Sequence, residues 1–219
     1  MPGKTTQSTN VYIALPPSGK GAAVLVLHAW WGLNDFFKGF CDRLAAEGFV
    51  AFAPDLFEGQ VANTIAGAKR LRDKPKLEPT DKTLIRVIEQ AINHTAVQGT
   101  TIGVVGFSMG GYWALWLSQH PELPIGATVT FYGVRAGDYT SSQAAFLGHF
   151  AEKDDWVSDS AFKKLKASLK TAGKVAEFFV YEDTSHWFFE SDRVDAYNSN
   201  AADLAWERTL EFLRKHLTK

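Results

Sequence analysis

Residues 100–112, TTIGVVGFSMGGY, constrain the fold more than any other part of the sequence. An apolar run at residues 102–105 leads into Gly-Phe-Ser-Met-Gly, and residues that favour a helix follow. A strand that turns sharply into a helix holds the serine between them in a strained backbone conformation at the tip of the turn. Gly106 and Gly110 flank this serine because a side chain at either position would clash where the strand and the helix approach each other. We therefore expect a strand–turn–helix unit that exposes Ser108 as a nucleophile.

Apolar runs alternate with segments of helical periodicity along the rest of the chain. The runs predict strands at residues 11–15, 22–27, 49–53, 102–105, 126–132, 144–150 and 174–181. Strands that alternate with helices indicate an α/β fold with a mostly parallel sheet flanked by helices. Ligands bind such sheets beyond the carboxyl ends of the strands. Residues 133–142 are too few to form a large cap domain, so the cleft at that end is expected to be open.

The segment between the third and fourth strands is less regular. Within residues 56–79, helical spacing of Ile65, Ala68 and Leu71 suggests one short helix, whose role stays open. Thr80 is expected to cap the next helix. The buried stripe of that helix is predicted to consist of Leu84, Ile88, Ala91 and Ile92.

Composition limits the classes of function. The chain of 219 residues is long enough for one domain, residues 1–219, and its 46% hydrophobic and 21% charged residues are typical of a globular protein. A net charge of -1 favours neither nucleic acid nor an anionic membrane as a partner, and no apolar run is long enough to span a bilayer. The single cysteine, Cys41, and an N-terminal segment without the apolar core of a signal peptide suggest a cytoplasmic protein.

The sequence also lacks the spacings that hold metals or nucleotides. It contains no HExxH or CxxC motif, no GxGxxG loop and no Walker A loop. We therefore expect no metal and no cofactor. The oligomeric state stays open.

A serine hydroxyl needs a base within hydrogen-bond reach, and that base needs an acid that fixes its tautomer and stabilises its cation. When the three groups follow successive strands in the order serine, acid, histidine, they can meet at one edge of a parallel sheet. Asp154 follows the strand at residues 144–150, and His186 follows the strand at residues 174–181. Asp155 adjoins Asp154 and is an alternative acid, although Asp154 leads the turn and is favoured.

The other histidines compete less well for the role of base. His94, His120 and His216 lie on predicted helices or at their ends, where surface positions explain them. His149 lies within a strand and is expected to be a hydrogen-bonded core residue. His28 ends a strand, so it could line the site or serve a structural role.

An acyl-transfer site also needs two backbone N–H donors for the oxyanion. One is expected from Met109, the residue after the nucleophile, and the other from Trp30, in the loop after an early strand. Several aromatic residues on or next to the same loops could wall a substrate pocket or pack in the core. They are Trp30, Trp31, Phe36, Trp156, Trp187 and Phe188.

Taken together, these segments resemble the dienelactone hydrolase family of α/β-hydrolases over nearly the whole chain. The matching segments are HAWWGLN at residues 28–34, residues 44–45, 48–51 and 53–56, GFSMGG at 106–111, GHF at 148–150 with Asp154, HWF at 186–188, Arg193, Tyr197 and residues 201–213. The resemblance implies an α/β-hydrolase fold with an eight-stranded sheet and no large lid. It also implies hydrolysis of a small ester or lactone through an acyl-enzyme, with Ser108, Asp154 and His186 as the triad.

Three positions depart from the family pattern. The best-known members use a cysteine nucleophile, whereas this chain has Ser108, and they have a glutamate where Ala29 stands. The arginine that grips a substrate carboxylate four residues after the catalytic histidine is replaced by Glu190, and no second arginine for this role can be identified in residues 56–79. We therefore expect neutral short-chain esters to be preferred over esters or lactones that carry a carboxylate.

The sequence thus predicts a serine esterase. Acyl transfer to another acceptor and peptide hydrolysis remain alternatives, because the first half-reaction is the same. A ligand-binding module on an inactive hydrolase fold is the alternative from a different class.

Overall fold

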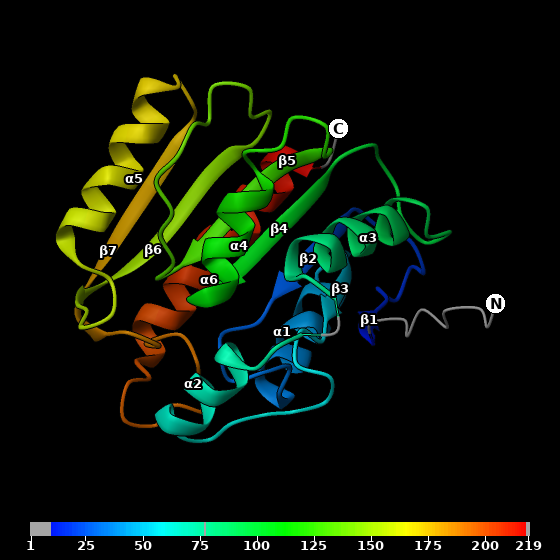
Figure 1. Ribbon diagram of the computed structural model, residues 1–219. Coiled ribbons are helices and arrows are strands. Elements are labelled where there is room, and N and C mark those ends of the chain that lie inside the picture. Colours follow the sequence, from blue (N-terminus) through cyan, green and yellow to red (C-terminus); the bar gives the residue numbers. More distant parts are fainter. Residues whose placement is uncertain (1–9, 77, 218–219) are drawn as a thin grey trace.

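A computed structural model describes residues 10–76 and 78–217 of the protein. The chain folds into a twisted sheet with helices on both faces (Figure 1). The sheet has the strand order β1-β3-β2-β4-β5-β6-β7. Its strands are β1 (Val11–Ala14), β2 (Ala23–Leu27), β3 (Val50–Pro54), β4 (Ile102–Phe107), β5 (Ile125–Phe131), β6 (Ala145–Lys153) and β7 (Ala176–Ser185).

Parallel pairing holds throughout the sheet except at one edge, where β1 runs antiparallel to β3. Strands β2, β3 and β4 are buried along their whole length, as their continuous apolar runs predict for strands covered on both faces. The α/β fold with a mostly parallel sheet is confirmed. The eight strands implied by the family resemblance are not found, because the described residues form a seven-stranded sheet.

The helices divide between the two faces of the sheet. They are α1 (Asp35–Ala46), α2 (Ile65–Asp73), α3 (Thr80–Ile92), α4 (Met109–Leu117), α5 (Asp159–Thr171) and α6 (Ser199–Leu217). Buried residues of α1 and α6 share one hydrophobic core with one side of the sheet, and those of α3, α4 and α5 share a second core with the other side. The result is a three-layer arrangement in which the sheet separates two cores.

Two predictions about α3 are wrong. Thr80 is its first helical residue rather than its cap, because the preceding Pro79 occupies the cap position and makes no side-chain hydrogen bond there. Of the predicted stripe, Leu84, Ile88 and Ala91 are buried, whereas Ile92 is exposed at the last turn.

The short helix suggested within residues 56–79 exists as α2, with only Ala68 buried. It lies near the loops that follow β2 and β6, because Arg72 approaches the ring of Trp30 and Lys69 approaches that of Trp156. The irregular segment therefore covers part of the edge at which the strands end.

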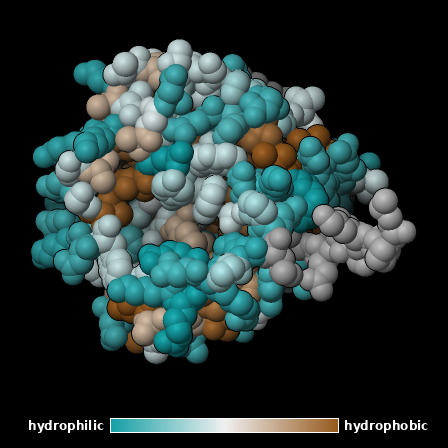
Figure 2. Space-filling view, in the orientation of Figure 1, coloured by the Kyte–Doolittle hydropathy of each residue, from teal (hydrophilic) through white to brown (hydrophobic). Residues whose placement is uncertain are grey.

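Hydrophobic residues on the face shown in Figure 2 form several separate patches between hydrophilic ones. Within the part of the chain that the structure describes, no helix has both the length and the apolar character needed to cross a bilayer.

Candidate active site

Ser108 lies on a strained turn between β4 and α4. Its backbone has φ +51° and ψ −107°, a region that a residue with a side chain rarely adopts. A Cβ on Gly106 would overlap the carbonyl of Gly110, and one on Gly110 would overlap the carbonyl of Leu27. The two glycines are therefore required by the close approach of strand and helix, as the sequence predicts.

Ser108, His186 and Asp154 form a chain of hydrogen bonds. Each follows directly on the last residue of a strand: Ser108 on β4, Asp154 on β6 and His186 on β7. The Oγ of Ser108 lies 2.9 Å from Nε2 of His186. The two carboxylate oxygens of Asp154 lie 2.9 and 2.8 Å from Nδ1 of the same ring. This arrangement suits a hydroxyl that gives its proton to an imidazole oriented by a carboxylate.

The choice between the two adjacent aspartates follows from the turn that holds them. Oδ1 of Asp154 accepts the backbone N–H groups of Trp156 and Val157, at 2.8 and 2.9 Å. These bonds turn the carboxylate inward, where only 7% of its side chain is exposed, and it meets His186 there. Asp155 is exposed and makes no such contact.

The two predicted oxyanion donors lie on neighbouring segments. Met109 is the first residue of α4, where a backbone N–H has no acceptor within the helix. Gly110 packs against the carbonyls of Leu27 and His28, which brings the start of α4 next to the loop that contains Trp30. The positive end of the helix dipole favours a negative charge at this point.

His28 and His149 are structural. His28 is buried, with Nδ1 2.6 Å from the carbonyl of Ala29 and Nε2 accepting the N–H of Leu56 at 3.2 Å. Burial lowers the pKa of His28 to about 4 and that of His149 to about 3. His149 bonds Tyr181 and Thr209 within the core, as predicted. The alternative in which His28 lines the site is not supported.

A pocket of about 440 Å³ adjoins His186. Indole rings of Trp31, Trp156 and Trp187 line it, and Trp156 is 43% exposed at its rim. The rings form a cluster with Trp30, with centroids of Trp30 and Trp156 4.9 Å apart. Three of the predicted pocket residues therefore lie where a substrate could contact them.

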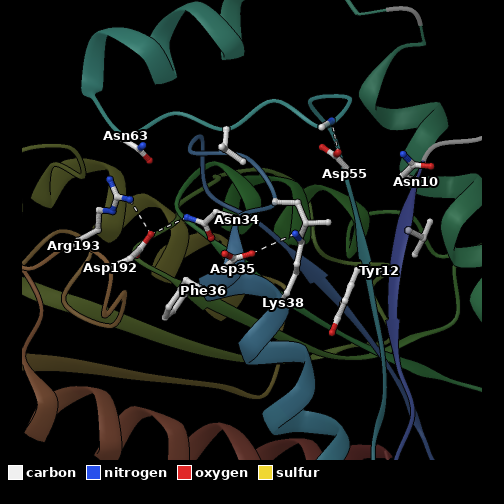
Figure 3. Close-up of a pocket in the computed structure, with 14 residues that line it drawn as sticks. Asn10, Tyr12, Asn34, Asp35, Phe36, Lys38, Asp55, Asn63, Asp192 and Arg193 are labelled. Carbon is white, nitrogen blue, oxygen red and sulfur yellow. Dashed lines mark hydrogen bonds and ion pairs between the residues drawn. The ribbon is translucent and has the colours of Figure 1, made fainter.

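Two of the remaining predicted pocket residues, Phe188 and Phe36, lie elsewhere. Phe188 is fully buried and packs against Tyr132 and Tyr181, so it belongs to the core behind the pocket. Phe36 lines a second groove of about 870 Å³, which shares Asn63, Asp192 and Arg193 with the first pocket. Figure 3 shows Asp192 between Arg193 and Asn34, bonded to both at 2.8 Å.

The sequence leaves open whether Arg193 or a cation within residues 69–76 lines the pocket, and the structure brings two arginines to it. Arg193 lines both cavities and lies 4.3 Å from the ring centre of Trp31, while Arg72 lies 5.7 Å from that of Trp30. Helical spacing places Arg72 one turn after the buried Ala68 on the same face of α2, but it does not show that this face covers the loop of Trp30.

Glu190, which stands where the family has an arginine, lies neither in the cleft nor in solvent. It is fully buried, and the hydroxyl of Tyr132 donates to its Oε1 at 2.7 Å. Repulsion of an anionic substrate by this side chain is therefore excluded as a basis for specificity.

The family model described as "Dienelactone hydrolase family" matches residues 9–217. The chain belongs to the dienelactone hydrolase family. Members of this family are hydrolytic enzymes, and the chain is a hydrolase.

Named relatives agree with this membership. A putative carboxymethylenebutenolidase of Aquifex aeolicus is 31% identical over 216 residues, which span 94% of this chain and 93% of the relative. A probable 2-oxo-3-(5-oxofuran-2-ylidene)propanoate lactonase of Bradyrhizobium sp is 29% identical over 238 residues, with 98% and 92% coverage. The crystal structure of a putative dienelactone hydrolase from Klebsiella pneumoniae superposes with a TM-score of 0.80 at 24% identity and covers 94% of this chain and 92% of that one, which shows the shared fold.

Among residues 10–76 and 78–217, no group of three or more histidine, cysteine, aspartate or glutamate side chains could hold a metal ion.

Proposed function

We propose that the protein is a serine carboxylic-ester hydrolase that cleaves small esters or lactones through a covalent acyl-enzyme. The observation that carries this proposal is the hydrogen-bonded chain from Ser108 through His186 to Asp154, at the ends of three strands. The strained turn at Ser108 supports it further, because such strain is typical of functional positions.

The proposed reaction has two half-reactions. Oγ of Ser108 attacks the ester carbonyl as its proton passes to Nε2 of His186, and the backbone N–H groups of Met109 and Trp30 stabilise the oxyanion. When the C–O bond to the alcohol breaks, His186 gives that proton to the leaving oxygen. Water then attacks the acyl-enzyme with His186 as base, and the acid and the free serine are released. Asp154 orients the imidazole and stabilises its charged form throughout.

The substrate class is supported by the relatives and by the pocket. The names of two relatives, a carboxymethylenebutenolidase and a lactonase, both describe lactone hydrolysis. The pocket of about 440 Å³ beside His186 suits a small substrate. Its aromatic lining suits an apolar or planar acyl group.

Replacement of the nucleophile tests the proposal. Ser108→Ala should lower kcat for a nitrophenyl ester by roughly 10⁶-fold, with little change in stability. Ser118→Ala is a matched control at the other end of α4, where the hydroxyl bonds Ala114 and Thr128 away from the site. Its kcat should equal that of the wild type. Hydrolysis that persists in Ser108→Ala would reject the mechanism, and an inactive wild type would favour the ligand-binding module.

A further inference from the structure

Glu190 is a buried carboxyl near His186 that the proposed reaction does not use. It lies four residues after His186 in a tight turn, where its N–H donates to the carbonyl of Trp187 and its carbonyl accepts the N–H of Arg193, each at 2.9 Å. Burial raises the pKa of Glu190 to about 8, and the charge of Asp192 adds to the rise, whereas Tyr132 and Arg193 oppose it. The carboxyl is therefore mostly protonated near neutral pH and does not act as a charged partner of the base.

Tyr132 joins this carboxyl to the imidazole. Its hydroxyl donates to Oε1 of Glu190 at 2.7 Å, and its ring centre lies 4.7 Å from that of His186. The residue follows β5 directly, and its backbone has φ +40°, which a tyrosine rarely adopts unless its surroundings hold it there. A bond from Tyr132 N to the carbonyl of His149, at 2.7 Å, and full burial of the ring hold it.

Trp31 brings a third segment to the same carboxyl. Nε1 of Trp31 and Oε2 of Glu190 are both buried and lack a hydrogen-bond partner in the described part of the chain. The indole N–H nevertheless acts on Glu190 by lowering its pKa. Trp31 adjoins Trp30, the proposed oxyanion donor, so this carboxyl lies where the loops after β2, β5 and β7 meet.

The bonds of His186 leave one motion of its ring open. Asp154 binds Nδ1 and Ser108 binds Nε2, so both bonds lie near the plane of the imidazole. Such bonds limit sliding of the ring more than rocking out of its plane. The aromatic contacts restrict rocking, since Tyr132 is tilted 54° to the imidazole and Trp187 meets it edge-on with centroids 4.9 Å apart.

We propose that Glu190 and Tyr132 are positioning residues: the carboxyl fixes the tyrosine, and the tyrosine ring holds the imidazole of His186 in line with Ser108. The proposal rests on the proposed function, because it concerns the same base.

Steady-state kinetics of three variants test it. Tyr132→Phe removes only the hydroxyl and should lower kcat about 5- to 10-fold, as expected for the loss of one hydrogen bond. Glu190→Ala frees the tyrosine and should lower kcat by about 10²-fold, because small misplacements of a catalytic group have effects of that size. Glu190→Gln keeps an oxygen that can accept the Tyr132 hydroxyl and should restore most of the lost rate. KM should change less than kcat in all three, since none of these changes removes a pocket-lining side chain.

Tyr139→Phe is the matched control. Tyr139 is also fully buried, and its hydroxyl donates to the carbonyl of Arg135 at the same 2.7 Å, in the core on the other side of the sheet. Both tyrosine variants should lose similar stability in thermal unfolding. Only Tyr132→Phe should lose kcat, and an equal kcat in the two variants would overturn the proposal.

The pH profile separates positioning from a purely structural role. As the pH passes about 8, Glu190 ionises beside Asp192, and the buried carboxylate then needs more donors than Tyr132 and Trp31 supply, while the charge of Arg193 favours the ionised form. We expect kcat of the wild type to fall as the pH rises above about 8, and we expect this fall to be absent in Glu190→Gln. An identical fall of kcat at alkaline pH in the two proteins would contradict the role of Glu190. If the wild type does not hydrolyse esters, or if its hydrolysis persists in Ser108→Ala, the proposed function itself is rejected.

Discussion

Two carboxyls lie near His186, one bonded to its imidazole and the other joined to it through Tyr132, and their surroundings differ. Asp154, in the turn after β6, faces Nδ1 of His186 and two backbone N–H groups, so three nitrogens surround its oxygens. Glu190, in the turn after β7, has one hydroxyl bonded to it and one indole N–H nearby. Donors that bond a carboxylate favour its charged form, whereas burial with few donors favours the neutral acid. Nearness in sequence is misleading, since Glu190 is four residues from His186 and Asp154 is thirty-two.

The comparison indicates that the two carboxyls suit different roles near His186. The charged carboxyl can stabilise an imidazolium as it forms, which the neutral one cannot do. The neutral carboxyl can be buried completely at low cost, and it suits a role in packing. Replacing the carboxyl by an amide at each of the two positions should therefore have very different effects.

The largest effect is expected at Asp154. Asp154→Asn removes the charge and disturbs the tautomer of His186, and it should lower kcat by roughly 10⁴-fold in an ester assay. Asp155→Asn is the control, because Asp155 is exposed beside the same turn. A larger loss in Asp155→Asn than in Asp154→Asn would show that the adjacent aspartate is the working acid.

The same exchange at Glu190 should stabilise the fold. A pKa of about 8 in the folded state, against an ordinary 4.5, means that the folded protein keeps a proton that the unfolded chain releases. The contribution of this proton to stability is complete below pH 4.5 and is lost as the pH rises to about 8. Glu190→Gln carries no such dependence, so its free energy of unfolding should exceed that of the wild type increasingly from pH 5 to pH 8. At 1.36 kcal/mol per unit the gain has an upper bound of roughly 5 kcal/mol. Urea unfolding at both pH values measures it, and a gain that does not change with pH would contradict the neutral state of Glu190.

Much of the fold and of the candidate site follows from local patterns. Apolar runs that alternate with helical segments predict the strands. Because Ser108, Asp154 and His186 each follow a strand, the topology alone places them at one edge of the sheet. The features that the sequence did not predict depend on contacts between segments that are distant along the chain. Phe188 and Glu190 follow His186 on a loop whose sequence does not decide between the pocket and the core, and both are buried because Tyr132 packs against one and bonds the other.

Helix α2 gives a second instance of this limit. Its sequence predicts a short helix but leaves its role open. The position of the helix over the loops after β2 and β6 brings Arg72 and Lys69 to the indoles. Periodicity describes which face of a helix is buried, but it does not say which loop the helix covers.

The smallest expected effect concerns the charge of the substrate. It distinguishes the influence of the buried Glu190 from that of Arg193, which lines the pocket. The expected preference for neutral esters rested on the absence of a carboxylate-binding arginine at position 190 and within residues 56–79. Glu190 is buried, whereas Arg193 lines the pocket and is bonded to Asp192 at 2.8 Å. A partly exposed, paired guanidinium should favour an anionic substrate only weakly. Arg193→Gln should therefore lower kcat/KM for an ω-carboxylate ester relative to its neutral analogue by up to about 5-fold, the size of an exposed ion pair, and less in high salt.

Glu190→Gln should leave the ratio of kcat/KM between the two substrates unchanged, because a neutral buried acid is exchanged for a neutral amide. A shift of that ratio in Glu190→Gln, with none in Arg193→Gln, would mean that Glu190 is charged and acts on the substrate, and the contrast between the two carboxyls would fail.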